Sequence, residues 1–202
     1  VLLILVAIFA DFLYDYDTEV IAQNIQERLI EPCLAHPFGT DEFGRDLLAR
    51  VVHGSRMSLI VSFSSVAISL TIGGLLGAVS GYYGGRIDDI IMRITDILLA
   101  IPMTLFAIVI VAALGANTRN LALALAASSV PIFARIVRGS VITVRDVEYV
   151  EAARAIGATN RVIIARHILP NCLAPIIVQV TLRIATAIYN TAALSFLGMG
   201  VQ

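Results

Sequence analysis

The sequence of 202 residues is 58% hydrophobic and only 14% charged, and its mean hydropathy is +0.89. Because a soluble domain carries about 25% charged residues, this composition excludes a water-soluble globular domain and indicates that lipid surrounds most of the chain. A net charge of −1 without any basic stripe gives no indication of nucleic-acid binding. All fourteen basic residues are Arg, so the chain has no phosphate-binding Lys. If ATP drives this protein, another chain has to bind it.

The chain begins with an apolar stretch, residues 1–10, that is too short to span a bilayer. A signal-peptide core is one interpretation; we favour the end of a first membrane helix, because no small-residue cleavage pattern follows. The next segment, 11–56, is polar and holds nine acidic residues against four Arg. We expect this segment to lie in water, and we expect the sequence to be truncated at both ends.

Four longer apolar segments predict membrane-spanning helices. Residues 57–85, for example, carry no formal charge and exceed the roughly 20 residues that cross the hydrocarbon. Pro102 predicts a kink in the second helix, and Gly73, Gly74 and Gly77 allow a neighbouring helix to approach closely. The sequence therefore predicts an all-α integral membrane protein, a polytopic helix bundle with about five membrane helices visible, in a single domain over 1–202. The four full helices are expected at residues 57–81, 88–114, 119–143 and 170–197.

Arginine is unequally divided between the two sides of these predicted spans. The side that receives 11–56 and 115–119 has five Arg against nine acidic residues, whereas the side that receives 82–93 and 135–167 has eight Arg against five. Basic residues accumulate on the cytoplasmic side of membrane proteins. We therefore expect 139–167 to be cytoplasmic and 11–56 to lie outside.

A polar stretch before the last apolar segment contains the most informative pattern. Glu151, Ala152 and Ala153 are followed by Gly157, and Pro170 opens the next span. The pattern predicts a short helix, a glycine turn and a second short helix, with the proline in a first helical turn, where its missing N–H costs nothing. From these properties alone, an ordinary loop at the lipid headgroups remains an alternative.

The pattern E-A-A-x-x-x-G, followed after nine residues by I-x-L-P, resembles the signature loop of ABC-importer transmembrane subunits. Here it ends in Leu169 and Pro170, and His167 stands where Ile is expected. Further segments are similar to the second, C-type permease of the dipeptide/oligopeptide/nickel importer family, in which a final span would follow Gln202. These segments are His36–Asp46, Gly81–Gly85, Asn171–Pro175 and Leu194–Gln202.

The resemblance implies the fold of a type I ABC-importer permease, in which 146–168 is a cytoplasmic coupling loop that contacts an ATPase. Glu151 would pair with or cap against the ATPase, and Ala152, Ala153 and Gly157 would allow close packing. The implied partners are a homologous second permease, two cytoplasmic ATPase subunits, an extracytoplasmic substrate-binding protein and membrane lipid. The resemblance implies no catalysis and no cofactor in this chain, and a location in the bacterial cytoplasmic membrane. Dipeptides, longer peptides, glutathione-like peptides and chelated nickel remain possible cargoes.

Arg183 is expected near the middle of the last apolar segment, where an ionisable residue suggests a function. It would either face the transport pathway, where it could meet a peptide carboxylate, or pair structurally with a partner subunit. The alternative to an ATP-driven importer is a secondary transporter, although that class usually has ionisable groups in several spans. An intramembrane enzyme is disfavoured, because no nucleophile is paired with a base.

Two further groups of polar residues have simpler interpretations. His36, His53 and His167 are too dispersed for a metal site, so each is interpreted as an isolated surface residue. Three acidic residues near the second span are expected to pair with Arg86 and Arg93 at the membrane interface. They are Asp88, Asp89 and Asp96.

Overall fold

The computed structural model describes residues 2–200, which are mainly helical and contain no strand; the only bridge in this range pairs Thr40 with Asp46. The chain therefore has the all-α architecture that its composition predicts. Contacts divide it into two compact units, Val1–Ile60 and Val61–Gln202, with the boundary inside helix α3 (Leu47–Tyr83). The prediction of one domain over the whole chain stays a prediction, and the units are described separately.

The first unit consists of short helices followed by irregular chain. The apolar stretch at its start forms a helix of only seven residues, α1, and Asp15 caps the π-helix η1 by accepting hydrogen bonds from the backbone N–H groups of Asp17 and Thr18, both at 3.0 Å. Asp46 accepts a hydrogen bond from the backbone N–H of Ala49 at 2.9 Å, just where α3 begins. The helices before α3 are α1 (Leu2–Ile8), α2 (Ala10–Leu13), η1 (Tyr16–Ile21) and η2 (Ile25–Glu27).

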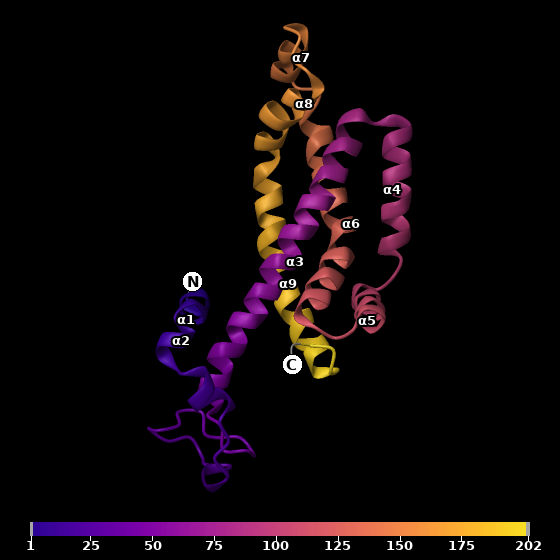
Figure 1. Ribbon diagram of the computed structural model, residues 1–202. Coiled ribbons are helices and arrows are strands. Elements are labelled where there is room, and N and C mark those ends of the chain that lie inside the picture. The colour runs from indigo at the N-terminus through magenta and orange to yellow at the C-terminus, as the bar shows by residue number, and fades with distance from the viewer. Residues whose placement is uncertain (1, 201–202) are drawn as a thin grey trace. The chain divides into compact units, whose positions relative to one another are not determined.

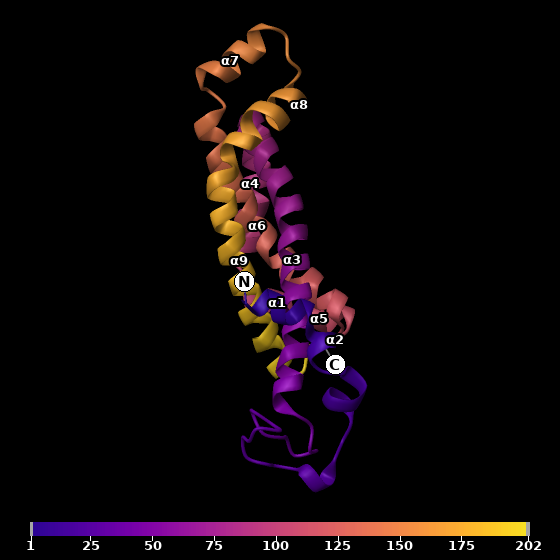
Figure 2. The same ribbon diagram turned by 90° about the vertical axis from the view of Figure 1, so that its left-hand side faces the viewer.

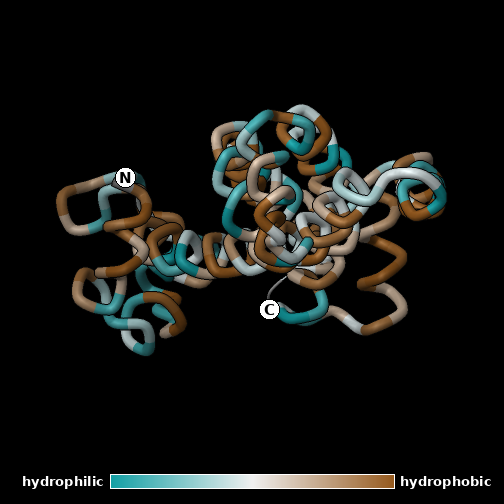
Figure 3. The backbone as a smooth tube through the Cα atoms, turned by 90° about the horizontal axis from the view of Figure 1, so that it is seen from above, coloured by the Kyte–Doolittle hydropathy of each residue, from teal (hydrophilic) through white to brown (hydrophobic). Residues whose placement is uncertain are grey.

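The second unit is a bundle of long apolar helices, with the short helices α7 and α8 at one end and the α5–α6 connection toward the other (Figures 1 and 2). Hydrophobic residues run along these helices, as Figure 3 shows from above. Helix α6 packs against α4, α5 and α9, so it is the central helix of this unit. After α3, its helices are α4 (Gly85–Leu99), α5 (Met103–Leu114), α6 (Thr118–Val144), α7 (Glu148–Ala155), α8 (Asn160–Val162), η3 (Ile163–Ile168), η4 (Leu169–Cys172) and α9 (Leu173–Phe196).

Three helical stretches of the described residues are long and apolar enough to cross a membrane, and a bent pair gives a fourth if it counts as one span. The first three are Leu47–Tyr83, Thr118–Val144 and Asn160–Phe196. The bent pair is α4 and α5, which lie at 86° to each other. The sequence predicted one kinked helix over 88–114, but the structure breaks it at residues 100–102. Pro102 lacks an N–H and disfavours helical conformation in the preceding residue, so the kink becomes a break.

Glycines set the distance between α3 and α6. A Cβ atom added at Gly73 would lie 2.5 Å from the carbonyl oxygen of Val130, and one at Gly77 would lie 2.9 Å from the backbone nitrogen of Arg138. At Gly74 the added atom would meet only Leu70 Cδ1, at 4.0 Å. Gly73 and Gly77 therefore permit the predicted close approach, whereas Gly74 is on another face of the helix. Helices in lipid associate through such contacts, because no hydrophobic force drives them together.

Two ion pairs connect α4 to α6. Asp88 binds the guanidinium of Arg138 through both carboxylate oxygens, at 2.5 and 2.6 Å, and Asp96 binds Arg135 at 2.6 Å. The interpretation that Asp88 and Asp96 pair with neighbouring arginines of their own segment is therefore wrong. Spacing along one helix shows which residues share a face, but it does not identify the helix that packs against that face.

Candidate functional site

The polar stretch between α6 and α9 folds into the short helix α7, which presents two different faces. Val150 and Ala153 are buried, whereas Glu151 and Ala152 are exposed. Acidic residues occupy its first turn and Arg154 its last, as the helix dipole favours. The exposed residues of α7 thus include the acidic Glu151 and the small Ala152, and the buried face attaches the helix to the rest of the loop.

Gly157 ends this short helix in a conformation that other residues rarely adopt. Its φ angle is +86°, in the left-handed region. Its N–H donates to the carbonyl oxygen of Arg154 at 3.1 Å, and the N–H of Ala158 donates to that of Ala153 at 3.1 Å. Ile156, just before the turn, is 85% exposed. The loop thus turns sharply and presents an apolar side chain to its surroundings.

A buried apolar cluster fixes the loop to the ends of the long helices. Val150 and Ile163 of the loop pack with Val137 and Val141 of α6 and with Cys172. Leu169 packs against this cluster, and Pro170 lies in the first turn of η4, which leads directly into α9. A displacement of α7 would therefore be transmitted to α6 and α9.

Tyr82, near the end of α3, forms a second connection to this loop that the sequence did not reveal. Its hydroxyl donates to Asn160 Oδ1 at 2.9 Å, and the guanidinium carbon of Arg154 lies 5.8 Å from its ring centroid. Beside it, Arg145 Nη1 donates to the carbonyl oxygen of Gly81 at 2.9 Å. No local pattern in the sequence identifies a partner 78 positions away.

Arg183 lies within α9, where no acidic residue of the described range, 2–200, forms an ion pair with it. Its Nε atom is buried and has no hydrogen-bond partner among these residues. Its Nη1 lies 3.9 Å from the sulfur of Met103, and Asn190 Nδ2 lies 3.9 Å from the same sulfur. Arg183 thus lies inside α9, whereas the residues of the 146–168 loop precede the start of that helix.

Comparison with known proteins shows which family has this arrangement. Residues 73–202 match the family described as binding-protein-dependent transport system inner membrane component. The match covers most of the chain, including α6, the loop with α7, and Arg183. The chain belongs to this family.

Several relatives of this chain are named as transport system permease proteins. The dipeptide transport system permease protein DppC of Alkalihalophilus pseudofirmus is 51% identical over 199 residues, which are 98% of this chain and 65% of the relative. The probable D,D-dipeptide permease DdpC of Escherichia coli K12 is 45% identical, and the glutathione permease GsiD of Pectobacterium atrosepticum is 43% identical, both over 202 residues. These two matches cover all of this chain and 67% and 66% of the relatives. The chain thus spans about two thirds of the length of these relatives.

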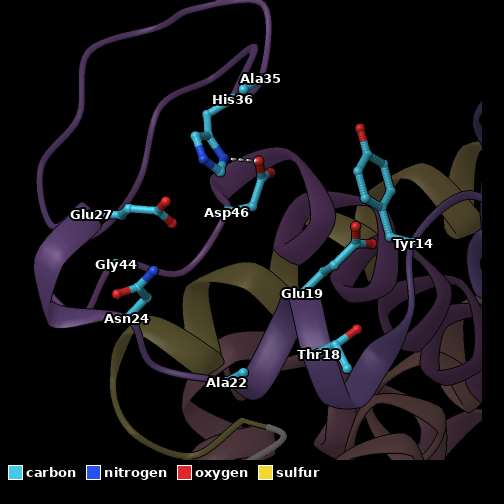
Figure 4. Close-up of a pocket in the computed structure, with 10 residues that line it drawn as sticks. All are labelled: Tyr14, Thr18, Glu19, Ala22, Asn24, Glu27, Ala35, His36, Gly44 and Asp46. Atoms are coloured by element: carbon cyan, nitrogen blue, oxygen red, sulfur yellow. Dashed lines mark hydrogen bonds and ion pairs between the residues drawn. The ribbon is translucent and has the colours of Figure 1, made fainter.

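The first unit of this transport component contains a cavity of about 200 Å³ (Figure 4). His36 Nδ1 lies 2.8 Å from Asp46 Oδ2 in its wall. Burial, together with the charges of Asp46 and Glu19, raises the pKa of the Tyr14 hydroxyl above its ordinary value. Glu19 and Glu27 also line the cavity, so three of its ten lining residues are acidic.

The prediction that each histidine is a surface residue is wrong for His53. Its side chain is buried, its Nε2 lies 2.9 Å from the carbonyl oxygen of Tyr14, and its ring centroid lies 5.3 Å from that of Tyr16. The described residues contain no group of three or more His, Cys, Asp or Glu side chains that could hold a metal ion. His53 of α3 therefore packs against Tyr14 and Tyr16 at the start of η1, which sequence spacing could not show.

Proposed function

We propose that this chain is the transmembrane subunit of an ATP-driven, binding-protein-dependent importer of peptides. The observation that carries the proposal is the loop of 146–168. The loop projects a short helix whose exposed residues include Glu151 and Ala152, and a glycine in the left-handed conformation ends this helix. The chain itself belongs to a family of binding-protein-dependent transport components. ATP hydrolysis would reside in partner subunits, since this sequence contains no Lys for a phosphate-binding loop.

In this proposal the loop is the contact with a cytoplasmic ATPase. Glu151 and Ala152 are exposed, so Glu151 would form a polar contact with the ATPase and Ala152 would let the two surfaces approach closely. Ala153 is buried and would pack α7 onto its own chain. Gly157 would shape the turn, and Leu169 and Pro170 would pass the motion of the loop to α9.

The complete importer would contain a homologous permease, two ATPase subunits and an extracytoplasmic substrate-binding protein. It would lie in the bacterial cytoplasmic membrane with 139–167 inside and 11–56 outside, as the arginine distribution favours. The relatives' names refer to dipeptides and to glutathione, which favours peptides over chelated nickel as cargo. Arg183 would lie beside the path of the cargo.

Reconstitution of the full-length chain with its partner subunits tests the proposed function. Peptide uptake into proteoliposomes should require both ATP and the loaded binding protein. Uptake that needs neither would contradict the proposal.

The orientation predicts how two cysteine positions react in spheroplasts. Cys33 is exposed in the external segment, so an impermeant maleimide should label the wild-type chain and should not label Cys33→Ser. In a Cys33→Ser background, Ile156→Cys should react only after permeabilisation, because Ile156 is exposed in the cytoplasmic loop. Buried Cys172 serves as the internal control. The reverse pattern would show that the orientation is wrong.

Tyr82 should transmit the motion of the coupling loop to α3. Tyr82→Phe removes the hydrogen bond to Asn160, which contributes about 1 kcal/mol, and Tyr82→Leu also removes the contact with Arg154. We expect both variants to retain the ATPase in a pull-down but to lower the ratio of cargo-stimulated to basal ATP hydrolysis several-fold, with the larger loss in Tyr82→Leu. Tyr83→Phe is the matched control, since the adjacent ring is 48% exposed. Equal ratios in all three variants would refute this role.

A further inference from the structure

The middle of the second unit contains a concentration of hydrogen-bond donors. Arg183 and Asn190 are seven positions apart on α9, which places them on the same face two turns from each other. Arg183 Nη1 and Asn190 Nδ2 each lie 3.9 Å from the sulfur of Met103. Because both nitrogens approach one atom, a small group that replaced this sulfur would reach both.

The sulfur is a poor partner for these donors. A thioether is only a weak acceptor and carries no charge to balance the guanidinium. Asn190 is only 5% exposed, and Arg183 Nε is buried without an acceptor among residues 2–200. A charged or polar group in such a place costs free energy unless a partner satisfies it.

Two of the three acidic residues of this unit's membrane helices are already engaged, and the third, Asp89 of α4, forms no ion pair with Arg183 among the described residues. Asp88 is bound to Arg138 and Asp96 to Arg135, both between α4 and α6. In the described part of the chain, Arg183 forms no ion pair with either. An anion that balances Arg183 would therefore come from outside the described residues.

We propose that Arg183 and Asn190 form a carboxylate-binding site inside the membrane. A guanidinium binds a carboxylate through two parallel hydrogen bonds, and the amide of Asn190 would donate a further one. The unbranched side chain of Met103 is flexible, so it would swing aside when the carboxylate enters. The inference rests on the proposed function, in which the carboxylate is the C-terminus of a peptide in transit. An acidic side chain of the second permease would offer the same chemistry.

The test compares two cargoes in proteoliposomes that contain the complete importer. Initial uptake is measured for a peptide with a free C-terminal carboxylate and for its C-terminal amide, each at a concentration that saturates the binding protein. We expect Arg183→Gln to slow uptake of the acid form by about tenfold or more and to abolish the preference for acid over amide. Asn190→Leu should have a smaller effect in the same direction. Met103→Leu, which removes the sulfur but neither donor, should keep the preference.

Assembly separates the two sources of the carboxylate. If Arg183→Gln and Asn190→Leu lower the amount of assembled complex, and the complexes that form keep the acid preference, the carboxylate belongs to the partner subunit and the site still stands. Asn190→Leu places an apolar side chain in an apolar helix, so it remains informative if Arg183→Gln does not accumulate. Unchanged assembly together with an unchanged ratio of acid to amide uptake would overturn the site. Failure of the proposed function would appear separately, as wild-type complexes without ATP-dependent uptake.

Discussion

Replacing Glu151 by Lys, or Gly157 by Val, is expected to abolish cargo-stimulated ATP hydrolysis while the membrane level of the chain stays near normal. Glu151 is exposed in α7, so reversing its charge disturbs no contact within the chain that would prevent folding. At an interface with the ATPase, breaking a buried charged contact costs about 3–5 kcal/mol. A pull-down from detergent measures how much ATPase stays bound to each variant. The rate of ATP hydrolysis is then measured with and without the loaded binding protein.

Gly157→Val acts through the backbone alone. A Cβ atom at Gly157 would meet no other atom within 4 Å, but its φ of +86° would cost a branched residue about 1–2 kcal/mol. The turn would relax and move Ile156 from its exposed position just before the turn. Gly139→Ala in α6 is the control, since it adds a Cβ atom to a helical glycine where nothing lies within 4 Å. Normal stimulation in Glu151→Lys and Gly157→Val would mean that the loop is only a connector.

Gly77→Val should prevent the close packing of α3 on α6 and therefore destabilise the folded chain. Its Cβ would press on the carbonyl oxygen of Ala134 and lie 2.9 Å from Val137 Cβ, and neither helix backbone can yield at small cost. Overpacking of this kind typically costs about 1–3 kcal/mol. We expect a fall of several degrees in the thermal midpoint of the detergent-purified protein, or loss of accumulation.

Gly74→Val is the matched control for this substitution, because it lies three positions away on the same helix and its Cβ would touch only Leu70 at 4.0 Å. It should leave the midpoint within about one degree of wild type, since substitutions away from packed features usually change stability by less than about 0.5 kcal/mol. Equal midpoints for the two variants would show that α3 and α6 do not pack through this face.

The composition of the chain was enough to predict membrane helices, because burial in lipid requires long uncharged stretches whatever their neighbours are. Turn chemistry likewise indicated Gly157, since a glycine after a short helix has a defined conformational use. Pro102 predicted a kink, whereas the helix breaks there and its two parts lie at 86°. The packing of α5 against α6 could not be seen in the sequence.

Contacts between distant helices could not be predicted in the same way. Periodicity assigns a residue to a face, but it does not say which helix covers that face. The partner of Asp88, the connection between Tyr82 and Asn160, and the approach of Met103 to Arg183 and Asn190 all depend on how the bundle assembles. Gly73 and Gly74 are adjacent in sequence, but only Gly73 lies against α6. The sequence does not show which of the two glycines faces that helix.

The energy source for uptake is the most direct test of whether this chain belongs to an ATP-driven importer. Proteoliposomes containing the full-length chain, its partner subunits and the binding protein would be loaded with ATP, or given an imposed proton or sodium gradient without ATP, and supplied with labelled dipeptide. We predict uptake with ATP and the loaded binding protein, none with either gradient alone, and none in the Glu151→Lys complex. Uptake driven by an ion gradient in the absence of the ATPase subunits would identify a secondary transporter and contradict the account.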